Sequence, residues 1–410
     1  MSEADSQQRK ILLDIYAAAL QAVDGRRVVR DYLQHHPVYS EVNLIAIGKA
    51  AASMTRGALD VLDADIRRAL IITKNGHCDP SLSFECLQSG HPVPDGNSLI
   101  AGERLLRFVT SVPAGTIPLF LISGGSSSLV EVASKGVGLD ELSRVNSWLL
   151  GSGLDIAAMN AVRKRISCIK GGRLAKYLCG RRVLNLMISD VVGDDPATIG
   201  SGLLTPDSEQ NLLPWEKLPR WLQELCRREA AAPEADASCF RSVESVVLAN
   251  NRQATEAAAM AGSAAGLPVY RSTDLFHNDA LQLGKQFARQ VLEGPSGLYI
   301  WGGESTVTLP PSPGRGGRNQ SLALAAAQVL AGNDAIFFLA AGTDGTDGPT
   351  ESAGALVDGG TVIRGRCEGL DAGECLSQAD AGTFLEASGD LICTGPTGTN
   401  VMDLVLSLKI

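Results

Sequence analysis

The chain has 410 residues, of which 45% are hydrophobic and 20% charged, a composition typical of a folded globular protein with two or three domains. Its formal net charge of −9 argues against a general nucleic-acid-binding protein, which would carry a basic face. No apolar run approaches the roughly 20 residues that a membrane-spanning helix needs, and the polar start MSEADSQQRK is not a signal peptide.

The nine cysteines are scattered without a CxxC pair, and Cys78 and Cys86 have no matching second pair. This pattern disfavours a secreted disulfide scaffold and a zinc module, so we predict reduced thiols and a cytoplasmic location. None of the five histidines has a partner at HxH or HxxxH spacing, which disfavours zinc catalysis.

The first part of the chain alternates helices with apolar strands. Helices are predicted over 8–35, 50–59 and 98–110, and strands over 42–47, 69–73, 117–122 and 183–189. The last two strands are continuously apolar, which indicates a sheet covered on both faces and hence a parallel one. We therefore predict a doubly wound α/β domain over residues 1–240.

Residues 205–244 are polar and rich in proline, with one amphipathic segment at 221–228 and a predicted linker or exposed loop at 230–238. A strand, SVVLA, and an Ala-rich helix follow. We predict a second, smaller α/β domain over 241–410, whose strands lead into the loops GRGGRNQ, TDGTDG and TGTN.

At least six apolar strands end in loops of Gly, Ser, Thr, Asp or Asn. In open α/β sheets, ligands lie beyond the carboxyl ends of the strands, so these loops predict a ligand site. The chain has neither a P-loop nor a GxGxxG motif after its first strand, so a standard dinucleotide site is not supported.

Lys49 directly follows the strand 42–47 and Gly48, where its ammonium group could bind a phosphate or a carboxylate. The alternative is an exposed lysine at a helix start, a position that the helix dipole disfavours for a cation. The loop after the strand 117–122 offers backbone N–H groups and hydroxyls to an anion. Its proposed binding residues are Ser123, Gly124, Gly125 and Ser126.

Asp190 is the first carboxylate after the strand 183–189 and is our candidate for a base or a metal ligand, whereas Asp195 precedes a proline and could only shape the turn. The basic stretch between Asn160 and Arg173 could clamp an anionic substrate in part. For most of its residues, a solvated helix face is the favoured interpretation.

The C-terminal loops carry the other candidates. Arg318 is framed by glycines and could present a bidentate fork to phosphate or carboxylate, and Asn319 could cap a helix that begins at Ser321. Asp344 and Asp347 could hold Mg²⁺, which takes one or two carboxylates together with substrate phosphates. The proposed nucleotide contacts in these loops are Gly316, Gly317, Asn319, Thr397, Gly398 and Asn400.

Nine motifs in this order resemble the class II glycerate kinases (glycerate 2-kinases), from about residue 8 to 408. They are IGKAA, GHPVPD, SGGSSSL, NAVRKRIS with IKGGRLA, SDVVGDDP, GGEST, GRGGRNQ, AGTDGTDGP and TGTNVMD. The chain departs from the family pattern at 200–203 (GSGL) and at Ser321.

The resemblance implies a Rossmann-like N-terminal domain, a smaller C-terminal α/β domain and an active site in the cleft between them. It implies transfer of the γ-phosphoryl group of ATP, with Mg²⁺, to O2 of D-glycerate. Lys49 and Arg318 match the family's lysine and arginine, and we place Asp190 with them as a catalytic residue.

Which aspartate is the base and which binds metal stays open. Two other functions are weighed: an NAD(P)H-dependent hydroxypyruvate reductase and a non-catalytic sugar-acid-binding protein. We expect no nucleic-acid or membrane partner, and a homodimer is compatible with the sequence.

Overall fold

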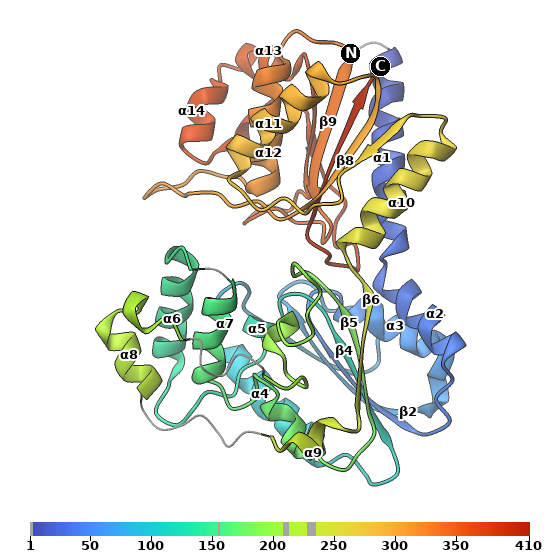
Figure 1. Cartoon of the computed structure of the whole chain (residues 1–410), viewed down its shortest axis with the longest axis vertical. Helices are drawn as coiled ribbons and strands as arrows, with labels where there is room; N and C mark the ends of the chain where they lie inside the picture. The colour runs from blue at the N-terminus through green and yellow to red at the C-terminus, as the bar shows by residue number, and fades with distance from the viewer. Residues whose placement is uncertain (1–2, 155, 208–212, 228–234) are drawn as a thin grey trace. The chain divides into compact units, whose positions relative to one another are not determined.

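The computed structural model describes residues 3–154, 156–207, 213–227 and 235–410. The chain divides into two compact units, which we name the parallel-sheet unit (residues 25–249) and the mixed-sheet unit (residues 1–24 and 250–410). Each unit contains one six-stranded sheet (Figure 1). The predicted α/β fold class is therefore confirmed.

All neighbouring strands of the first sheet run parallel, in the order β3-β2-β1-β4-β5-β6. This is the strand order of a doubly wound dinucleotide-binding sheet, and it reverses between β1 and β4. Every residue of β1, β4 and β5 is buried, which explains sequences that are apolar apart from Asn43 and Asn185. The strands are β1 (Val42–Ile47), β2 (Ile66–Lys74), β3 (Glu85–Ser89), β4 (Ile117–Ile122), β5 (Val183–Ile188) and β6 (Val243–Ala249).

Helices cover both faces of this sheet, with α2 and α3 on one face and α4 on the other (Figure 1). The helices are α2 (Gly25–His35), α3 (Ala51–Leu62), α4 (Gly96–Thr110), α5 (Ser126–Leu129), α6 (Leu139–Gly151), α7 (Ile156–Arg165), α8 (Arg220–Arg227) and α9 (Ala237–Phe240). Short 3₁₀ turns lie at Asp63–Asp65, Arg173–Leu178, Ile199–Ser201 and Trp215–Lys217.

The second sheet has the order β11-β10-β9-β12-β8-β7, in which β7 and β8 are parallel and the other pairs antiparallel. Its strands are β7 (Val269–Arg271), β8 (Gly297–Gly303), β9 (Ile336–Gly342), β10 (Gly354–Asp358), β11 (Leu391–Ile392) and β12 (Asp403–Lys409). In Figure 1, α11 and α12 lie on one face of this sheet, and α1 and α10 lie on the other. The helices are α1 (Glu3–Ala22), α10 (Asn251–Ala264), α11 (Ala280–Glu293), α12 (Arg318–Leu330), α13 (Thr361–Cys367), α14 (Ala372–Ser377) and α15 (Ala381–Ala387).

The division of the chain differs from the predicted boundary between 240 and 241 in two ways. The predicted helix 8–35 is two helices, and the first of them, α1, packs on α10 and β12 of the mixed-sheet unit. Strand β6 pairs with β5 and completes the parallel sheet. A strand's sequence shows that it is buried but not which sheet it joins. Residues 230–234 of the predicted linker or exposed loop at 230–238 lie outside the described residues. Helix α9 begins within its remaining part, at 237.

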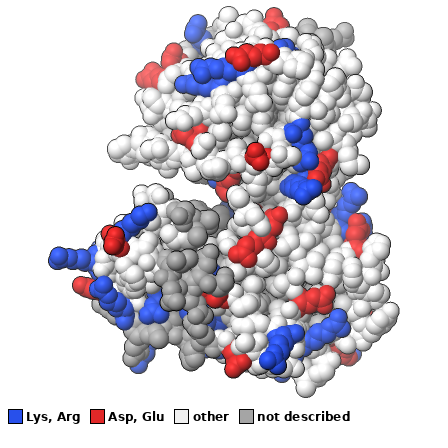
Figure 2. All heavy atoms as spheres, viewed as in Figure 1, with Lys and Arg blue, Asp and Glu red and all other residues white. Residues whose placement is uncertain are grey.

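Four of the nine cysteines form disulfides, Cys78 with Cys86 and Cys179 with Cys239, so the prediction of reduced thiols is wrong for these four. The fold brings the two cysteines of each pair together. The spacing of cysteines in the sequence does not reveal these pairs. Among the described residues, no helix is both long and apolar enough to cross a bilayer. On the face drawn in Figure 2, Lys and Arg side chains lie among Asp and Glu side chains, and uncharged residues cover most of the surface.

Candidate active site

The loops after β1 and β4 lie side by side in the parallel-sheet unit, at the point where the strand order reverses. The N–H of Lys49 donates to the carbonyl of Gly124 at 2.9 Å, and the N–H of Ala50 donates to Oγ of Ser123 at 3.0 Å. Gly48 has a φ of +131°, and a Cβ there would lie 2.2 Å from Oγ of Ser123. Only glycine permits this approach, so Gly48 fixes where Lys49 leaves the sheet.

The side chains of Lys49 and His91 both lie against Gly125. A Cβ on Gly125 would be 3.4 Å from Cγ of Lys49 and 3.0 Å from Cδ2 of His91. His91 follows β3, the strand at the edge of the sheet. The spacing of the histidines does not single out His91 in the sequence, although this residue belongs to the GHPVPD motif.

A cavity of about 150 Å³ opens beside these loops. Asp190, which follows β5, lines it together with Arg163 and Asn160 of α7 and with His91 and Ser127. The cavity therefore offers one guanidinium group, one carboxylate, one imidazole and several hydroxyl and amide groups. Such a set can hold a small hydroxy acid.

Arg163 is the main cation of this cavity that the sequence did not single out. Its Nε donates to Oδ1 of Asn146 at 3.2 Å. Burial lowers the pKa of the guanidinium group, and the carboxylate of Glu131 opposes this shift. Desolvation of this kind makes the group a strong partner for an incoming carboxylate.

The hydroxyl groups beyond Gly125 form a connected network. Ser127 and Ser201 share a hydrogen bond of 2.6 Å, and Ser201 donates to Oδ1 of Asn160 at 3.1 Å. Within the described residues, Oγ of Ser126 is buried without a hydrogen-bond partner, and it lies 2.4 Å from the place where a Cβ on Gly200 would be. The network links the loop after β4 to α7 and to the wall of the cavity.

Most of the remaining basic stretch has a structural role. Lys170 is buried in an ion pair with Glu131, and Lys164 is buried at 3.0 Å from Asp207. Arg173 donates to the carbonyl of Lys164 at 2.8 Å. The prediction of a solvated helix face is therefore wrong for these three buried residues. Carboxylates distant in sequence neutralise Lys164 and Lys170, and Arg173 is held by backbone carbonyls.

Asp195 shapes the turn after β5, as predicted. It accepts hydrogen bonds from the N–H of Ala197 and from Oγ1 of Thr198, both at 3.0 Å.

The mixed-sheet unit carries a second group of predicted residues, around the start of α12. Asp347 accepts hydrogen bonds from the N–H groups of Asn319 at 3.1 Å and of Gln320 at 2.8 Å. The predicted cap is therefore wrong in two respects: α12 begins at Arg318, and Asp347 caps it. A Cβ on Gly317 would lie 2.2 Å from Cγ of Asp347, so a larger residue there would displace the cap.

Arg318 is held by two carboxylates. One nitrogen of its guanidinium group pairs with Glu304, and the other lies 3.4 Å from Oδ2 of Asp403. Burial alone would lower the pKa of Arg318, but the carboxylates of Asp403 and Glu304 raise it overall, so the group stays charged. Asp403 was not predicted as a site residue, although it ends the TGTNVMD motif.

The carboxylates around Arg318 raise one another's pKa values. Burial raises the pKa of Asp347 to about 7, and the charge of Asp403 adds to this shift. Burial also raises the pKa of Asp403 to about 6; the charge of Arg318 opposes the shift, and those of Glu304 and Asp344 add to it. Negative charges held together in this way favour a bound cation.

Two glycine-rich loops interlock at this end of the mixed sheet. Oγ1 of Thr397 donates to the carbonyl of Thr343 at 2.5 Å, and Oγ1 of Thr343 donates to the carbonyl of Met402 at 2.6 Å. A Cβ on Gly345 would lie 2.1 Å from the carbonyl oxygen of Gly395. The hydroxyl of Thr397 therefore joins two loops, and its predicted contact with a nucleotide stays a prediction.

The predicted residues thus form two groups. Lys49, the loop Ser123–Ser126 and Asp190 lie together in the parallel-sheet unit. The others, Arg318 among them, lie together in the mixed-sheet unit. Within the described residues, no three His, Cys, Asp or Glu side chains are arranged to hold a metal ion by themselves.

Two family models match the chain, "Domain of unknown function (DUF4147)" over residues 11–222 and "MOFRL family" over residues 297–403. The D-glycerate 2-kinase of Thermotoga maritima is 37% identical, over 98% of this chain and 98% of its own. The chain belongs to the glycerate kinase family.

A crystal structure of glycerate kinase from Thermotoga maritima agrees with this assignment. It superposes with a TM-score of 0.82 and 34% identity, covering 99% of this chain and 100% of its own. A relative from Agrobacterium vitis, 35% identical over 98% of this chain and 95% of its own, carries the provisional name hydroxypyruvate reductase.

Proposed function

We propose that this chain is an ATP-dependent glycerate 2-kinase, which transfers the γ-phosphoryl group of ATP to O2 of D-glycerate and forms 2-phosphoglycerate and ADP. The observation that carries the proposal is the match, over nearly the whole chain, with the D-glycerate 2-kinase of Thermotoga maritima. The sheet has the dinucleotide-binding strand order but lacks the GxGxxG loop, which favours a kinase over a reductase.

In this proposal, the cavity of the parallel-sheet unit binds glycerate. Arg163 pairs with the substrate carboxylate, because it is the desolvated guanidinium group of the lining. Ser127 and Asn160 bind the hydroxyl groups. Asp190 accepts the proton of the attacking O2, since a carboxylate within reach of the hydroxyl can act as a general base.

The charge of the phosphoryl group is the second requirement. Lys49 is placed beside the same loop by Gly48 and stabilises the developing negative charge, together with the N–H groups and hydroxyls of Ser123–Ser126. Arg318 supplies a guanidinium group that its neighbours keep protonated. We assign Gly316, Gly317, Asn319, Thr397, Gly398 and Asn400 to contacts with the nucleotide.

The carboxylates near Arg318 fit a magnesium ion, because they repel one another and Mg²⁺ needs few protein ligands when phosphates supply the rest. When bound, Mg²⁺ would neutralise part of the charge on the phosphates. Asp344 and Asp347 stay the proposed ligands. Oδ1 of Asp344 also accepts hydrogen bonds from Thr346, and both oxygens of Asp347 accept hydrogen bonds from α12.

The test is a coupled assay with D-glycerate and ATP. Enolase alone, without phosphoglycerate mutase, should convert the product to phosphoenolpyruvate. A requirement for the mutase would show that the regiochemistry is wrong. Oxidation of NADH with hydroxypyruvate would instead indicate a reductase, and binding without turnover would indicate a non-catalytic sugar-acid-binding protein.

We also propose a cytoplasmic location, because ATP is the phosphoryl donor. The predicted homodimer and the predicted cleft between the domains stay predictions.

A further inference from the structure

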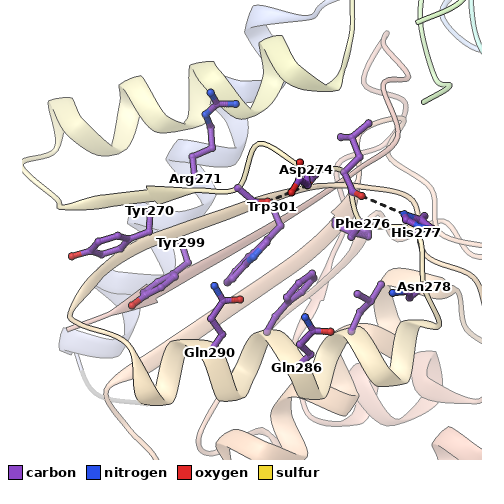
Figure 3. Close-up of a pocket in the computed structure, with 14 residues that line it drawn as sticks. Tyr270, Arg271, Asp274, Phe276, His277, Asn278, Gln286, Gln290, Tyr299 and Trp301 are labelled. Atoms are coloured by element: carbon purple, nitrogen blue, oxygen red, sulfur yellow. Dashed lines mark hydrogen bonds between the residues drawn. The ribbon is translucent and has the colours of Figure 1, made fainter. Parts of the chain in front are cut away.

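A second cavity, of about 540 Å³, lies in the mixed-sheet unit at the edge of its sheet (Figure 3). We name it the aromatic trough. It is bounded by the strands β7 and β8, by the loop 272–278 and by α11. The active-site proposal above uses none of its lining residues.

A row of aromatic rings forms the floor of the trough. Tyr270 pairs in register with Tyr299, and Trp301 lies two residues further along β8, so all three side chains emerge on the α11 face. The ring centroids of Tyr270 and Tyr299 are 4.9 Å apart, and those of Tyr299 and Trp301 are 5.8 Å apart. Tyr270 is 39% exposed, while Tyr299 and Trp301 are nearly buried. The row therefore ends in one ring with a free surface.

The opposite wall carries amide side chains. Gln286 and Gln290 are one helical turn apart on α11 and point toward the rings in Figure 3, and Asn278 lies at the start of this wall. Within the described part of the chain, none of these three side chains makes a hydrogen bond, nor does the indole N–H of Trp301. These exposed amide groups thus face the rings and are available to a ligand in the trough.

The charges of the lining disfavour an anion. Arg271 points toward α10 in Figure 3, and its guanidinium group lies 3.6 Å from Glu256 and 3.4 Å from Oγ1 of Thr255. Asp274 adds a carboxylate on the loop. A phosphate group would therefore meet a cation that is already paired, and a negative charge.

We propose that the aromatic trough binds an adenine-type nucleoside, an uncharged ligand, at a site separate from the phosphoryl-transfer site. Flat bases stack on exposed aromatic rings. Gln and Asn side chains can pair with the N6 and N7 atoms of adenine through one donor and one acceptor. A cavity of this volume is large enough for a base with its ribose.

Isothermal titration of the full-length protein with adenosine tests the proposal. We expect one binding event that saturating ATP does not displace. Tyr270→Ala and Gln290→Ala should each weaken adenosine binding roughly 10-fold. Tyr270→Ala removes the ring on which the base stacks, and Gln290→Ala removes an amide that pairs with the edge of the base. Both positions are exposed, so folding should be unaffected. Gln282→Ala, an exposed position on α11 outside the trough, is the matched control.

Kinase assays on the same variants separate this proposal from the proposed function. The kcat and the KM for ATP should stay at wild-type values, whether or not the substrate is glycerate. A parallel rise in the KM for ATP would make the trough the base site of the co-substrate and overturn the inference. Adenosine binding that is absent, that ATP displaces, or that both variants leave unchanged would also overturn it, as would equal binding of a neutral sugar such as glucose.

Discussion

Replacement of Arg163 by alanine tests the proposed substrate site most directly. The guanidinium group is largely desolvated in the cavity, and within the described residues its hydrogen bond goes to a neutral side chain, that of Asn146. A carboxylate that pairs with it would form charge-assisted hydrogen bonds, worth about 1.5–3 kcal/mol. Loss of this pair should therefore lower kcat/KM for D-glycerate about 10- to 150-fold. Because the pair forms on binding, most of the loss should appear in KM.

The substrate itself supplies the matched test. Glycerol retains the hydroxyl groups of glycerate but lacks the carboxylate, so Arg163→Ala should leave kcat/KM for glycerol, a weaker substrate in this proposal, within about threefold of the wild type. Arg163→Lys keeps the positive charge but loses the bidentate guanidinium group. Its kcat/KM for D-glycerate should therefore lie between the values of the wild type and of Arg163→Ala. Arg165→Ala is the control on the same helix, because Nε of Arg165 donates to the carbonyl of Cys226 and this residue does not line the cavity.

Two results would refute the reasoning. Equal losses on glycerate and glycerol would mean that Arg163 supports the structure of the cavity and does not recognise the carboxylate. An unchanged KM for glycerate, in a variant with a native circular dichroism spectrum, would place the carboxylate elsewhere.

Three further predictions concern the charged residues. Lys49→Ala and Arg318→Ala should stay folded and lose on the order of 10²-fold in kcat/KM; near-wild-type kinetics would remove either from the site. Asp344→Asn should regain activity in a Mg²⁺ titration and Asp190→Asn should not; the reverse pattern would exchange the two roles. The pKa of Asp403 is raised to about 6, so its stabilising contribution is present at low pH and is lost as pH rises through that value. Asp403→Asn should therefore flatten the fall in unfolding free energy between about pH 4 and 7 in denaturant titrations, and an unchanged slope would contradict the shift.

The sequence predicts the parallel sheet well, because burial on both faces makes β1, β4 and β5 almost entirely apolar, with Asn43 and Asn185 as the exceptions. It predicts the division of the chain less well. The helix α1 has no sequence feature that links it to residues more than 200 positions away, yet Oη of Tyr16 donates to the carbonyl of Gly342 at 2.7 Å. Long-range packing of this kind decides which unit a helix joins, and local periodicity does not record it.

The loops that follow strands supplied most of the predicted candidate residues, whereas Arg163, inside a helix, was not singled out. Lys49 and Asp190 follow β1 and β5, so strand assignment alone places them at the ligand-binding edge of the sheet. Arg163 lies among other cations on α7, and only the structure shows that Lys164 is neutralised by Asp207 while Arg163 faces the cavity. A basic stretch in the sequence does not distinguish a substrate-binding arginine from one half of a buried ion pair.

The glycines next to the two principal cations have a common physical role that their sequence motifs only suggest. Gly48 lets the loop after β1 approach Ser123, and Gly317 lets the start of α12 approach Asp347; in each case a Cβ would come within 2.2 Å of its neighbour. Each glycine directly precedes the cation that we assign to catalysis, Lys49 or Arg318. These backbone contacts therefore fix the point at which each charged side chain leaves the main chain. Phosphoryl transfer depends mainly on positioning of this kind. It follows that these glycines matter for the positions of the charges at least as much as for the turns themselves.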